Sequence, residues 1–373
     1  MELSEVQEQA VNEALNCEFI YSITGSAGTG KSTVIAEICR RTNLNYEVLS
    51  PTGRAAELLR QKINKGMTIH KFLEYYSMDK GKSYRPKYNV NNQILGYDLL
   101  IIDEASMIAR DVWDNLLKAL PDSTKIILVG DKNQLPPIEN VPQESAFSLC
   151  LSHYPFIELT TRYRFGKQAE LSKLSDYVLE GSFNKVISNP MSYRLDGFTD
   201  EMIINRMCAT EKYYGLDSQI ICPVYKGKTG CDYINRLCQL HRFKDIPTDE
   251  AGLIKGDKVI VTMNTPYFYN GNILFYDHCT EDEIVFSDMT VPRYLEYGDI
   301  TLDLLNCVKL AYAITTHKSQ GGEYKNVVYV IGKTALPIIN RSNIYTGITR
   351  SKENLIILYD RWTLQKGLSN VNV

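Results

Sequence analysis

Short apolar runs alternate with stretches of helical spacing along most of this chain. Val6, Ala10, Val11 and Ala14 recur on one helix face, so the sequence predicts an amphipathic helix near its start. Apolar runs of strand length stand at 19–23, 46–49, 99–102, 125–129, 219–222, 326–331 and 355–359. Helices are expected from about residue 32, at 54–61 and at 229–241. Strands and helices that alternate in this way predict an α/β protein with parallel sheets, whose functional residues lie at the carboxyl ends of the strands.

Two domains and a β-rich insertion are predicted from where this pattern stops and returns. The strands fall into an early and a late set, so we expect one domain over 1–165 and a second over 166–373. Within about 245–305 the pattern changes to short β-rich segments, separated by turn signals such as Asn270-Gly271-Asn272. The clearest of these segments are 258–262, 273–276 and 283–286. They predict a small β-barrel inserted into the second domain.

Composition places the chain among ordinary globular proteins. It has 373 residues, of which 44% are hydrophobic and 23% charged. No apolar run is long enough to cross a bilayer, and the first residues lack the layout of a signal peptide. The nine cysteines are scattered without a C-x-x-C pair, which indicates free thiols in a reducing compartment. We therefore expect a cytoplasmic protein that does not contact membranes.

Charge is distributed unevenly along the chain. The net charge of −3 argues against a protein that coats nucleic acid through bulk positive charge. Basic residues are concentrated at 60–87, however, and acidic residues at 277–303. A protein that must bind and release a polyanion needs a basic groove rather than a basic surface. Each of these two segments could also be a solvent-exposed face without a binding role, and for the acidic segment we prefer that interpretation.

A glycine-rich segment carries the clearest chemistry. Gly25-Ser26-Ala27-Gly28-Thr29-Gly30-Lys31-Ser32 fits G-x-x-x-x-G-K-[ST] between a predicted strand and a predicted helix. The glycines allow successive backbone N–H groups to curl around phosphate oxygens. Lys31 would reach the β- and γ-phosphates of a nucleotide, and the Ser32 hydroxyl would hold Mg²⁺. The segment therefore predicts a P-loop that binds ATP and Mg²⁺.

A pair of carboxylates supports this prediction. Asp103 and Glu104 follow the apolar run 99–102, so both side chains are expected at the edge of the sheet where the phosphates should lie. Asp103 would bind Mg²⁺, and Glu104 would orient and deprotonate the attacking water. P-loops also serve kinases, GTPases and transporters, so these two sites alone indicate only nucleotide hydrolysis.

Several other segments carry distinctive residues in a fixed order. They are Leu3–Val11, Ser50–Ala56, Thr68–His70, Asp103–Ser106, Gly130–Pro137, Leu159–Phe165, Tyr312–Gly321 and Tyr345–Lys352. G-D-x-x-Q-L-P-P at 130–137 and A-I-T-T-H-K-S-Q-G at 313–321 are distinctive on their own. Together with the P-loop, this series resembles the motifs of superfamily-one helicases, and especially those of the RecD- and Dda-like branch.

The resemblance implies a specific version of the α/β fold. Two RecA-like P-loop domains with parallel sheets would hold ATP between them. A pin-like insertion is expected at 70–97 in the first domain. The β-rich segment at about 245–305 is similar to the SH3-like barrel that this branch inserts into its second domain.

The resemblance also assigns residues to ATP chemistry. Gln134 would sense the γ-phosphate, and Gln7 would read adenine. Arg164 and Arg350 would act as arginine fingers, with Arg162 a close competitor of Arg164. The residues expected to be catalytic are Lys31, Asp103, Glu104, Gln134, Arg164 and Arg350. Those expected to bind the nucleotide are Gln7, Gly25, Ser26, Ala27, Gly28, Thr29, Gly30, Lys31, Ser32, Thr33 and Gln320.

A further set of residues is expected to touch nucleic acid. By resemblance the set comprises Thr52, Gly53, Arg54, His70, Thr315 and His317. Contacts of this kind bind phosphates and position a strand without reading its sequence. For the two histidines, a role as hydrogen-bonded structural residues remains equally open.

The resemblance extends to partners and setting. It implies single-stranded DNA and single-strand/duplex junctions as the track, with movement 5′→3′. A monomer in a bacterial or phage-infected cell is expected, working beside replication, recombination or repair proteins. The chain lacks the long N-terminal region of RecD itself, so its protein partners are expected to differ. Three alternatives stay open: a translocase or remodelling ATPase that does not unwind, a subunit that unwinds only when a partner loads it, and a nucleotide-gated binding switch.

The segment from about 76 to 96 is predicted to separate strands. Its sequence is turn-prone at 78–82 and 89–92, and 83–87 lacks the apolar periodicity of a core element. It is too long for an ordinary connection within a compact α/β domain, which favours a functional insertion. A wedge of this kind would block one strand of a duplex while the motor pulls the other.

Overall fold

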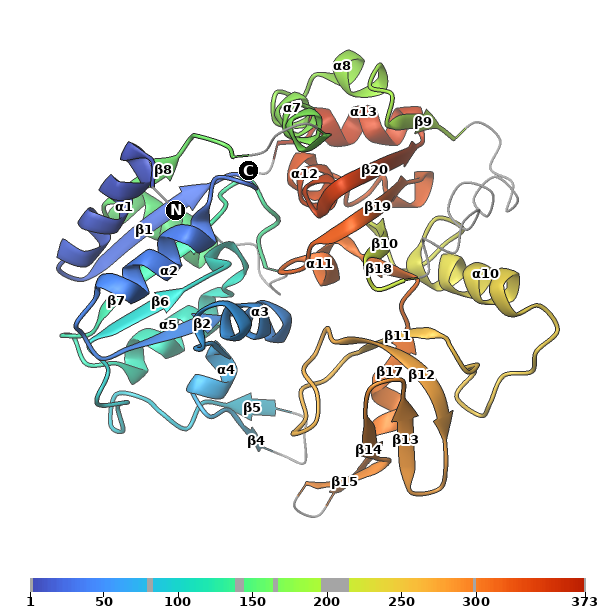
Figure 1. Cartoon of the computed structure of the whole chain (residues 1–373), viewed down its shortest axis with the longest axis horizontal. Coiled ribbons are helices and arrows are strands. Elements are labelled where there is room, and N and C mark those ends of the chain that lie inside the picture. Colours follow the sequence, from blue (N-terminus) through green and yellow to red (C-terminus); the bar gives the residue numbers. More distant parts are fainter. Residues whose placement is uncertain are drawn as a thin grey trace. The chain divides into compact units, whose positions relative to one another are not determined.

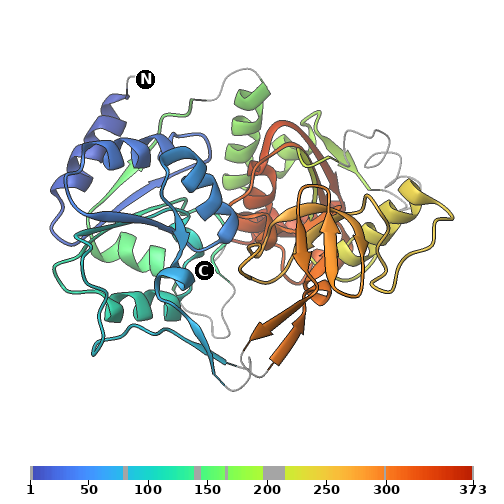
Figure 2. The ribbon, with the colours of Figure 1, turned by 60° about the horizontal axis from the view of Figure 1, so that its bottom comes forward.

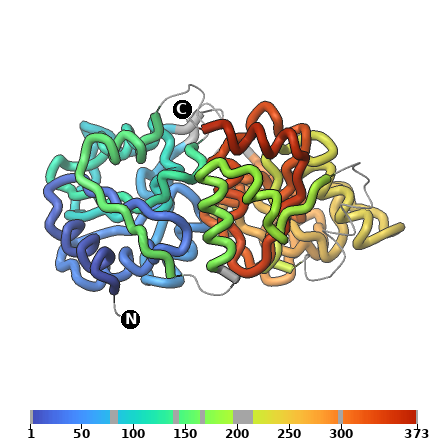
Figure 3. The backbone as a smooth tube through the Cα atoms, turned by 90° about the horizontal axis from the view of Figure 1, so that it is seen from above, coloured from blue at the N-terminus to red at the C-terminus, as the bar shows by residue number. Residues whose placement is uncertain are grey.

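A computed structural model of the chain describes residues 3–78, 83–137, 144–163, 167–195, 215–297 and 300–371. The chain divides into two compact units, Met1–Arg164 and Phe165–Val373. Figure 3 follows the backbone through the first unit in blue to green and through the second in green to red. Within the described residues, no helix is both long and apolar enough to cross a bilayer.

The first unit is built on a six-stranded sheet in the order β3-β2-β6-β7-β1-β8, in which all neighbouring strands pair in parallel. Its strands are β1 (Ile20–Gly25), β2 (Tyr46–Ser50), β3 (Met67–Thr68), β6 (Leu99–Ile102), β7 (Lys125–Gly130) and β8 (Phe156–Leu159). Its helices are α1 (Glu5–Asn16), α2 (Lys31–Arg41), α3 (Gly53–Ile63), α4 (Ile69–Phe72), α5 (Arg110–Ala119) and α6 (Ala146–His153). Successive crossovers between parallel strands place these helices over the sheet.

Helices cover both faces of this sheet because successive strand residues point to opposite sides. Leu99 and Ile101 of β6 pack in one core with apolar residues of α1, α2 and α3. Leu100 and Ile102 pack in a second core with α5 and α6. Figure 1 shows α1 and α2 in dark blue on one side of the sheet. The sheet is therefore buried on both faces, which explains why its strands read as continuous apolar runs.

The second unit contains a five-stranded parallel sheet in the order β18-β10-β19-β20-β9. Its strands are β9 (Ser192–Arg194), β10 (Ser218–Cys222), β18 (Ala313–Thr315), β19 (Tyr324–Ile331) and β20 (Ser351–Tyr359). Its helices are α7 (Lys167–Leu179), α8 (Phe183–Ile187), α10 (Cys231–Phe243), α11 (Thr316–Ser319), α12 (Arg341–Thr349) and α13 (Arg361–Ser369). The two parallel sheets confirm the predicted α/β class.

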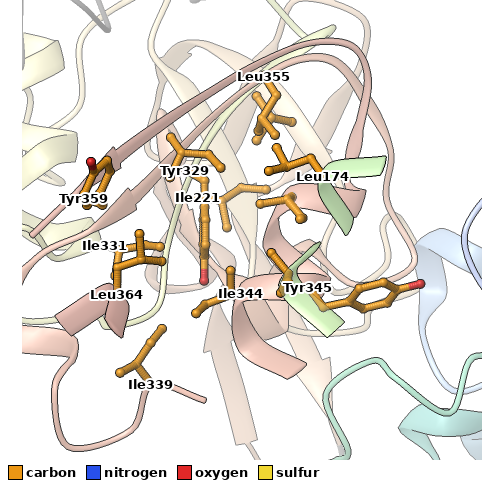
Figure 4. Packing of buried hydrophobic residues seen from close by; sticks show 14 of the residues in the cluster. Leu174, Ile221, Tyr329, Ile331, Ile339, Ile344, Tyr345, Leu355, Tyr359 and Leu364 are labelled. Carbon is orange, nitrogen blue, oxygen red and sulfur yellow. The ribbon is translucent and has the colours of Figure 1, made fainter. Parts of the chain in front are cut away.

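The larger core of this unit lies on one face of that sheet. Leu174 of α7, Ile344 and Tyr345 of α12 and Leu364 of α13 pack against strand residues such as Tyr329 (Figure 4). Residues of α10 cover the opposite face, where they meet the alternate residues of the same strands.

A separate antiparallel sheet, in the order β14-β13-β12-β11-β17, belongs to the second unit. Its strands are β11 (Lys258–Val261), β12 (Ile273–Cys279), β13 (Glu283–Phe286), β14 (Thr290–Pro292) and β17 (Val308–Leu310), with a hairpin of β15 (Tyr294–Tyr297) and β16 (Ile300–Asp303) beside them. It has its own apolar core, which includes Val259, Ile284 and Leu304. Figure 2 shows this sheet in orange. The three predicted segments form β11, β12 and β13, whereas the identification of the insertion as an SH3-like module stays a prediction.

Buried polar groups join this insertion to the parallel sheet. The fully buried Asp257 carboxylate accepts hydrogen bonds from Tyr312 Oη (2.7 Å) and Gln239 Nε2 (2.5 Å). Lys258 is also fully buried, and its Nζ donates to the carbonyl oxygen of Ser218 at 2.6 Å. Breaking such contacts would leave buried polar groups unpaired, so they hold the insertion against the second unit's α/β core.

The region predicted to contain a pin forms a hairpin in its first half. Strands β4 (Tyr76–Met78) and β5 (Ser83–Arg85) pair antiparallel, with Tyr76 opposite Arg85. Residues 79–82, at the predicted tip, lie outside the described residues. Beyond the hairpin, Lys87 forms an ion pair with Glu74 at 2.5 Å, and Ile94 returns the chain to the core.

Candidate nucleotide and nucleic-acid sites

The P-loop has the backbone that a phosphate cradle requires. Strand β1 ends at Gly25 and α2 begins at Lys31. Gly28 and Gly30 have φ angles of 86° and 84°, a left-handed conformation that side chains with a Cβ rarely adopt. A Cβ on Gly25 would lie only 2.5 Å from Thr29 Oγ1. These positions therefore need glycine, and the loop can follow phosphate oxygens closely.

Lys31 lies folded back over this loop. Its Nζ donates hydrogen bonds to the carbonyl oxygens of Gly25 (2.6 Å) and Ser26 (3.1 Å). Both acceptors are neutral, so a phosphate oxygen would be a stronger partner for the ammonium group. Ser32 and Thr33 stand in the first turn of α2, whose N-cap Gly30 has no side chain to occupy the free N–H groups. Such a helix start is a ready site for anions.

The carboxylate pair leaves the end of β6 in a strained turn. The backbone N–H of Asp103 donates to Leu49 O at 3.0 Å, and that of Glu104 donates to Asp103 Oδ1 at 2.9 Å. Glu104 has φ 53° and ψ 38°, a left-handed conformation that costs a non-glycine residue about 1–2 kcal/mol. Burial, together with the neighbouring Glu104, raises the pKa of Asp103 to about 7, although Lys31 opposes this shift. Backbone strain beside a buried carboxylate is typical of functional sites.

Two buried acceptors near the ends of β6 and β7 lack partners. Among the described residues, Glu104 Oε2 and Gln134 Oε1 are inaccessible to solvent and accept no hydrogen bond. Gln134 is presented by a turn in which its own N–H donates to Asp131 O at 3.1 Å. An unpaired buried acceptor costs about 1–3 kcal/mol. The missing partners are hydrogen-bond donors or a cation, which water molecules and the Mg²⁺ of a bound nucleotide would supply. The residues present therefore fit Mg²⁺-ATP, with Ser32 and Asp103 as the predicted metal ligands.

Gln7 is tied to the P-loop. Its Nε2 donates to Thr29 O at 3.1 Å, and its Oε1 accepts from the backbone N–H of Ser4 at 3.1 Å. The second contact belongs to a capping box that starts α1. A Cβ on Gly30 would lie 2.3 Å from Gln7 Nε2, so the two segments are in close contact. Both ends of the amide have protein partners, and adenine reading by Gln7 stays a prediction.

Replacing Gln7 by alanine tests that role. If the amide reads adenine, the KM for ATP should rise about 2- to 10-fold, the equivalent of one hydrogen bond, while the KM for GTP stays constant. Steady-state hydrolysis of both nucleotides measures this, with Gln9→Ala on the same helix as the matched control. An equal rise for ATP and GTP would mean that Gln7 only holds the P-loop in place.

Tyr163 was missed among the predicted site residues. Its backbone N–H donates to Gly28 O at 3.0 Å, and its ring, which is 42% exposed, lies near Gly30. Its place next to Arg164 in the predicted motif was the available signal. Arg164 itself lies outside the described residues, and its rival Arg162 is half-buried.

In the second unit, Arg350 is a buried cation with neutral partners. Arg350 is only 3% exposed. It donates to Thr346 O (3.1 Å), Gly322 O (3.3 Å) and Thr349 Oγ1 (3.4 Å), and no ion pair involves it among the described residues. Gln320 is also buried, two residues before Gly322. A buried guanidinium without a carboxylate is costly unless an anion arrives, which suits a residue that meets phosphate.

Three threonines of the predicted nucleic-acid motifs cap helices. Thr52, Thr68 and Thr315 accept N–H hydrogen bonds at the starts of α3, α4 and α11. Each hydroxyl keeps its own proton, which it can donate to a phosphate oxygen. Gly53 and Arg54 occupy the first two positions of α3, next to Thr52.

The two histidines sit in different surroundings. The His70 ring contacts that of Tyr75, with centroids 4.7 Å apart and ring planes tilted by 50°, and the protein around it lowers its pKa, although Asp111 acts in the opposite direction. Burial lowers the pKa of His317 too. Both rings are therefore mainly neutral at pH 7, and a contact with a strand would rely on hydrogen bonding or stacking rather than on charge.

The order of the strands separates the residues predicted to contact nucleic acid from those predicted to bind the nucleotide. In the first unit, β3 and β2 lead to Thr68 and Thr52 at one end of the sheet. The neighbouring strands β6, β7 and β1 lead to Asp103, Gln134 and the P-loop. In the second unit, Thr315 ends β18 whereas Arg350 immediately precedes β20. Because these strands are parallel, the two residues lie at opposite edges of their sheet.

Comparison with known proteins places the chain in a family. A model of the AAA domain matches residues 2–190, just over half of the chain. The chain belongs to the AAA-domain family. A second model, for the UvrD-like helicase C-terminal domain, matches residues 310–358, which include β18, β19 and Arg350.

Individual relatives make the assignment narrower. The chain is 27% identical to the RecBCD enzyme subunit RecD of Buchnera aphidicola subsp. Schizaphis graminum, over 91% of this chain and 70% of that protein. It is 27% identical to the ATP-dependent RecD2 DNA helicase of Deinococcus radiodurans, over 94% of this chain but only 48% of that protein. The fold is similar to that of the Pif1 helicase from Bacteroides in complex with ADP-AlF3 and ssDNA, with a TM-score of 0.62 and 18% identity over 96% of this chain and 92% of that one. The chain is an ATP-hydrolysing helicase of superfamily one with two RecA-like domains; its sequence is similar to those of RecD proteins, and its fold is similar to that of the Pif1 helicase.

Proposed function

We propose that this helicase moves 5′→3′ along single-stranded DNA and unwinds duplex DNA, driven by hydrolysis of Mg²⁺-ATP. The observation that carries the proposal is the pair of unpartnered buried acceptors, Glu104 Oε2 and Gln134 Oε1, in the unit that holds Lys31 and the P-loop. Most buried polar groups have hydrogen-bond partners, so two unpartnered acceptors beside the P-loop fit a place for a bound donor or cation. The RecD2 relative, an ATP-dependent DNA helicase by name, supports DNA as the substrate.

Each residue of the nucleotide site has a proposed role. Lys31 would neutralise charge on the β- and γ-phosphates, and Ser32 and Asp103 would hold Mg²⁺, which supplies charge stabilisation when bound. Glu104 would accept a proton from the attacking water. The remaining proposed contacts are Gln7, Gly25 to Gly30, Thr33, Gln134 and Gln320, with Arg164 and Arg350 as arginine fingers.

The proposed track follows the helix-capping threonines. Thr52, Gly53 and Arg54 of the first unit, with His70, would bind the backbone of the strand. Thr315 and His317 of the second unit would do the same. Backbone contacts carry no sequence information, so we expect little sequence preference. We propose that the protein works as a monomer in the cytosol, beside replication, recombination or repair proteins.

Polarity gives the sharpest test of the proposed function. Unwinding of a partial duplex should require a 5′ single-stranded overhang, because the protein is expected to move towards the 3′ end of the strand that it holds. Strand displacement on 5′-tailed, 3′-tailed and blunt duplexes of one sequence measures this. Efficient unwinding from 3′ tails would reverse the polarity. Strand-stimulated ATPase without unwinding of any substrate would favour a translocase, and an unstimulated rate would favour a binding switch.

We further propose that the β4–β5 hairpin is the wedge that separates strands. A wedge must project from the motor and remain independent of its ATP site. The hairpin joins the first unit through Glu74, Lys87 and the core residues that follow, while Tyr76 and Arg85 at its base are exposed. Neither strand of the hairpin belongs to the six-stranded sheet.

Shortening the hairpin tests the wedge. Replacing residues 77–84 by Gly-Gly would join Tyr76 directly to its cross-strand partner Arg85 through a two-residue turn, which keeps the base of the hairpin intact. Strand-stimulated ATPase should persist while unwinding collapses. The control is Lys80→Ala with Lys82→Ala, which keeps the length but removes charge. If that control loses as much unwinding as the shortened variant, the lysines hold the strand and no wedge is needed. Normal unwinding by the shortened, folded variant would also refute the wedge.

A further inference from the structure

A cavity in the second unit lies outside the residues discussed so far. Its volume is about 470 Å³, within the range of about 300–1,000 Å³ that is typical of ligand-binding clefts. The first half of α10, strand β17 and the turn at 250–253 line it, together with Arg293 and Asp303. None of the predicted nucleotide or nucleic-acid residues contributes to it.

The walls of the cavity are held rigidly. On one side, the Asp249 carboxylate accepts hydrogen bonds from the backbone N–H groups of Ala251 and Leu253, each at 2.9 Å. Arg293 pairs with Glu250 of the same turn at 2.7 Å and with Asp303 at 3.1 Å, so it ties this turn to the end of β16. A preformed cavity costs little ordering free energy when a ligand enters.

The rim carries an aromatic ring in a fixed position. Tyr225 is 46% exposed, in the loop between β10 and α10. That loop is closely packed, since a Cβ on Gly227 would lie 2.5 Å from Thr334, and Thr229 Oγ1 lies 2.6 Å from Thr334 Oγ1. The backbone N–H of Asp232 donates to Tyr225 O at 3.0 Å, and partial burial, together with the nearby Asp232 carboxylate, raises the pKa of the Tyr225 hydroxyl. The ring is therefore a pre-oriented surface on which a flat group can stack.

The lining favours a flat, uncharged ligand with polar edges. Its cationic groups, Arg236, Arg293 and Lys309, are balanced by Asp232, Glu250 and Asp303. Apolar wall is supplied by Leu253, Leu305, Val308 and Leu310. A phosphate alone would gain little from a neutral set of charges. A nucleobase presents apolar faces and polar edges, which match this combination.

Lysines stand beside the cavity at the carboxyl edge of the parallel sheet. Lys226 and Lys228 follow β10, Lys318 follows β18 and Lys333 follows β19, and all four are exposed. No ion pair involves any of them among the residues that the structure describes. Partial burial of its stem lowers the pKa of Lys318; Cys231 opposes this shift, and Lys309 at the cavity adds a smaller effect in the same direction as burial. This edge also carries Thr315, so it offers cations to the backbone of the proposed track.

We propose that this cavity holds one unstacked base of the single strand whose phosphates follow the neighbouring lysine edge. The proposal rests on the proposed binding of single-stranded DNA. Tyr225 stacks on the face of the base, and the charged side chains that line the cavity form hydrogen bonds with the polar edge of the base. A base held in this way would act as a brake on slipping of the strand, without reading its sequence.

Abasic scanning tests the proposal in the full-length protein. A duplex with a single-stranded thymidine tail fixes the register, and one abasic residue is moved along the tail. Fluorescence anisotropy should show one position, or two adjacent ones, where the abasic residue weakens binding by about 5- to 100-fold, the range for stacking of a base on an aromatic ring. Tyr225→Ala should weaken binding of the intact tail by a similar factor and remove the penalty at that position, whereas Tyr225→Phe should keep both.

A second variant guards against local unfolding in Tyr225→Ala. Ala251 is exposed at the rim, so Ala251→Trp should fill the cavity without disturbing a core, and Ala251→Ser is its control. The tryptophan variant should also lose the position-specific penalty. If the loss of binding free energy caused by Tyr225→Ala and the loss caused by the abasic residue are additive, the proposal is overturned. A normal abasic profile in Ala251→Trp would overturn it as well. Absence of strand-stimulated ATPase in the unaltered protein would refute the proposed function itself. Normal stimulation with a flat abasic profile would refute only the pocket, and would leave the cavity to a ligand other than DNA.

Discussion

Replacing Lys31 by alanine is expected to reduce strand-stimulated ATP hydrolysis to the background rate. The Lys31 ammonium group lies over the P-loop, where it donates hydrogen bonds to the neutral carbonyl oxygens of Gly25 and Ser26, and it is therefore available to phosphate oxygens. No other lysine or arginine belongs to the P-loop segment, so the charge on the β- and γ-phosphates would lose its closest compensation. Binding of single-stranded DNA in the absence of nucleotide should survive, because its proposed residues follow β2 and β3 rather than β1.

Phosphate-release kinetics at saturating strand concentration measure this effect, and anisotropy of a labelled oligonucleotide measures the retained binding. Lys118→Ala is the matched control, since Lys118 is exposed on α5 and belongs to none of the motifs. A thermal melt shows that both variants are folded. Near-normal turnover by Lys31→Ala would invalidate the assignment of the P-loop. Loss of strand binding as well as hydrolysis would mean that the two sites are not separable as proposed.

Arg350→Ala should lower the rate of ATP hydrolysis by roughly 10³-fold or more while changing ATP affinity only modestly, the effect typical of an arginine finger. In the structure the guanidinium is buried against neutral oxygens of Gly322, Thr346 and Thr349. Among the described residues no carboxylate neutralises this guanidinium, so its positive charge can stabilise the negative charge that develops on a transferred phosphoryl group. Arg350→Lys keeps the charge but loses the planar fork, and we expect it to recover only part of the rate.

Single-turnover hydrolysis separates the rate from nucleotide affinity, which is measured with a fluorescent ATP analogue. Arg361→Ala is the control, because Arg361 is exposed at the start of α13. Removal of Arg350 also takes a donor from the carbonyl oxygen of Gly322, so the melting temperatures must be compared first. If affinity falls severely while bound ATP turns over normally, Arg350 binds ground-state nucleotide and is not a finger.

The sequence by itself determined the features that depend on neighbouring residues. The P-loop could be predicted because its turn, its lysine and its flanking strand and helix lie within one short segment. The apolar runs predicted seven strands, and all seven form, as β1, β2, β6, β7, β10, β19 and β20. The predicted start of the first strand was wrong by one residue. The prediction included Phe19 because it is apolar, but Phe19 is 57% exposed and β1 begins at Ile20.

Other elements were not predicted from the pattern. Strands β3, β8 and β9 are only two to four residues long, which is too short for the alternation of apolar and polar residues to be recognised in the sequence. Helix α5 was missed although Val112, Trp113, Leu116 and Ala119 are buried at helical spacing, so the signal was available in the sequence. Arg164 remains a prediction from motif position alone.

Only the tertiary structure decided how distant segments meet. Strand order placed Thr52 and Thr68 at one end of the first sheet and Asp103 and the P-loop further along it. Packing also brought the Gln7 side-chain amide to Thr29 O, a contact between distant segments that no local pattern could reveal.

Long-range packing likewise left Glu104 Oε2 and Gln134 Oε1 without partners, and it brought Gly322 to Arg350. It also closed a cavity between α10 and β17. The physical reason is one of range. Periodicity and turn chemistry act over a few residues and specify the elements, whereas strand order and side-chain partners depend on how crossovers pack over a whole sheet.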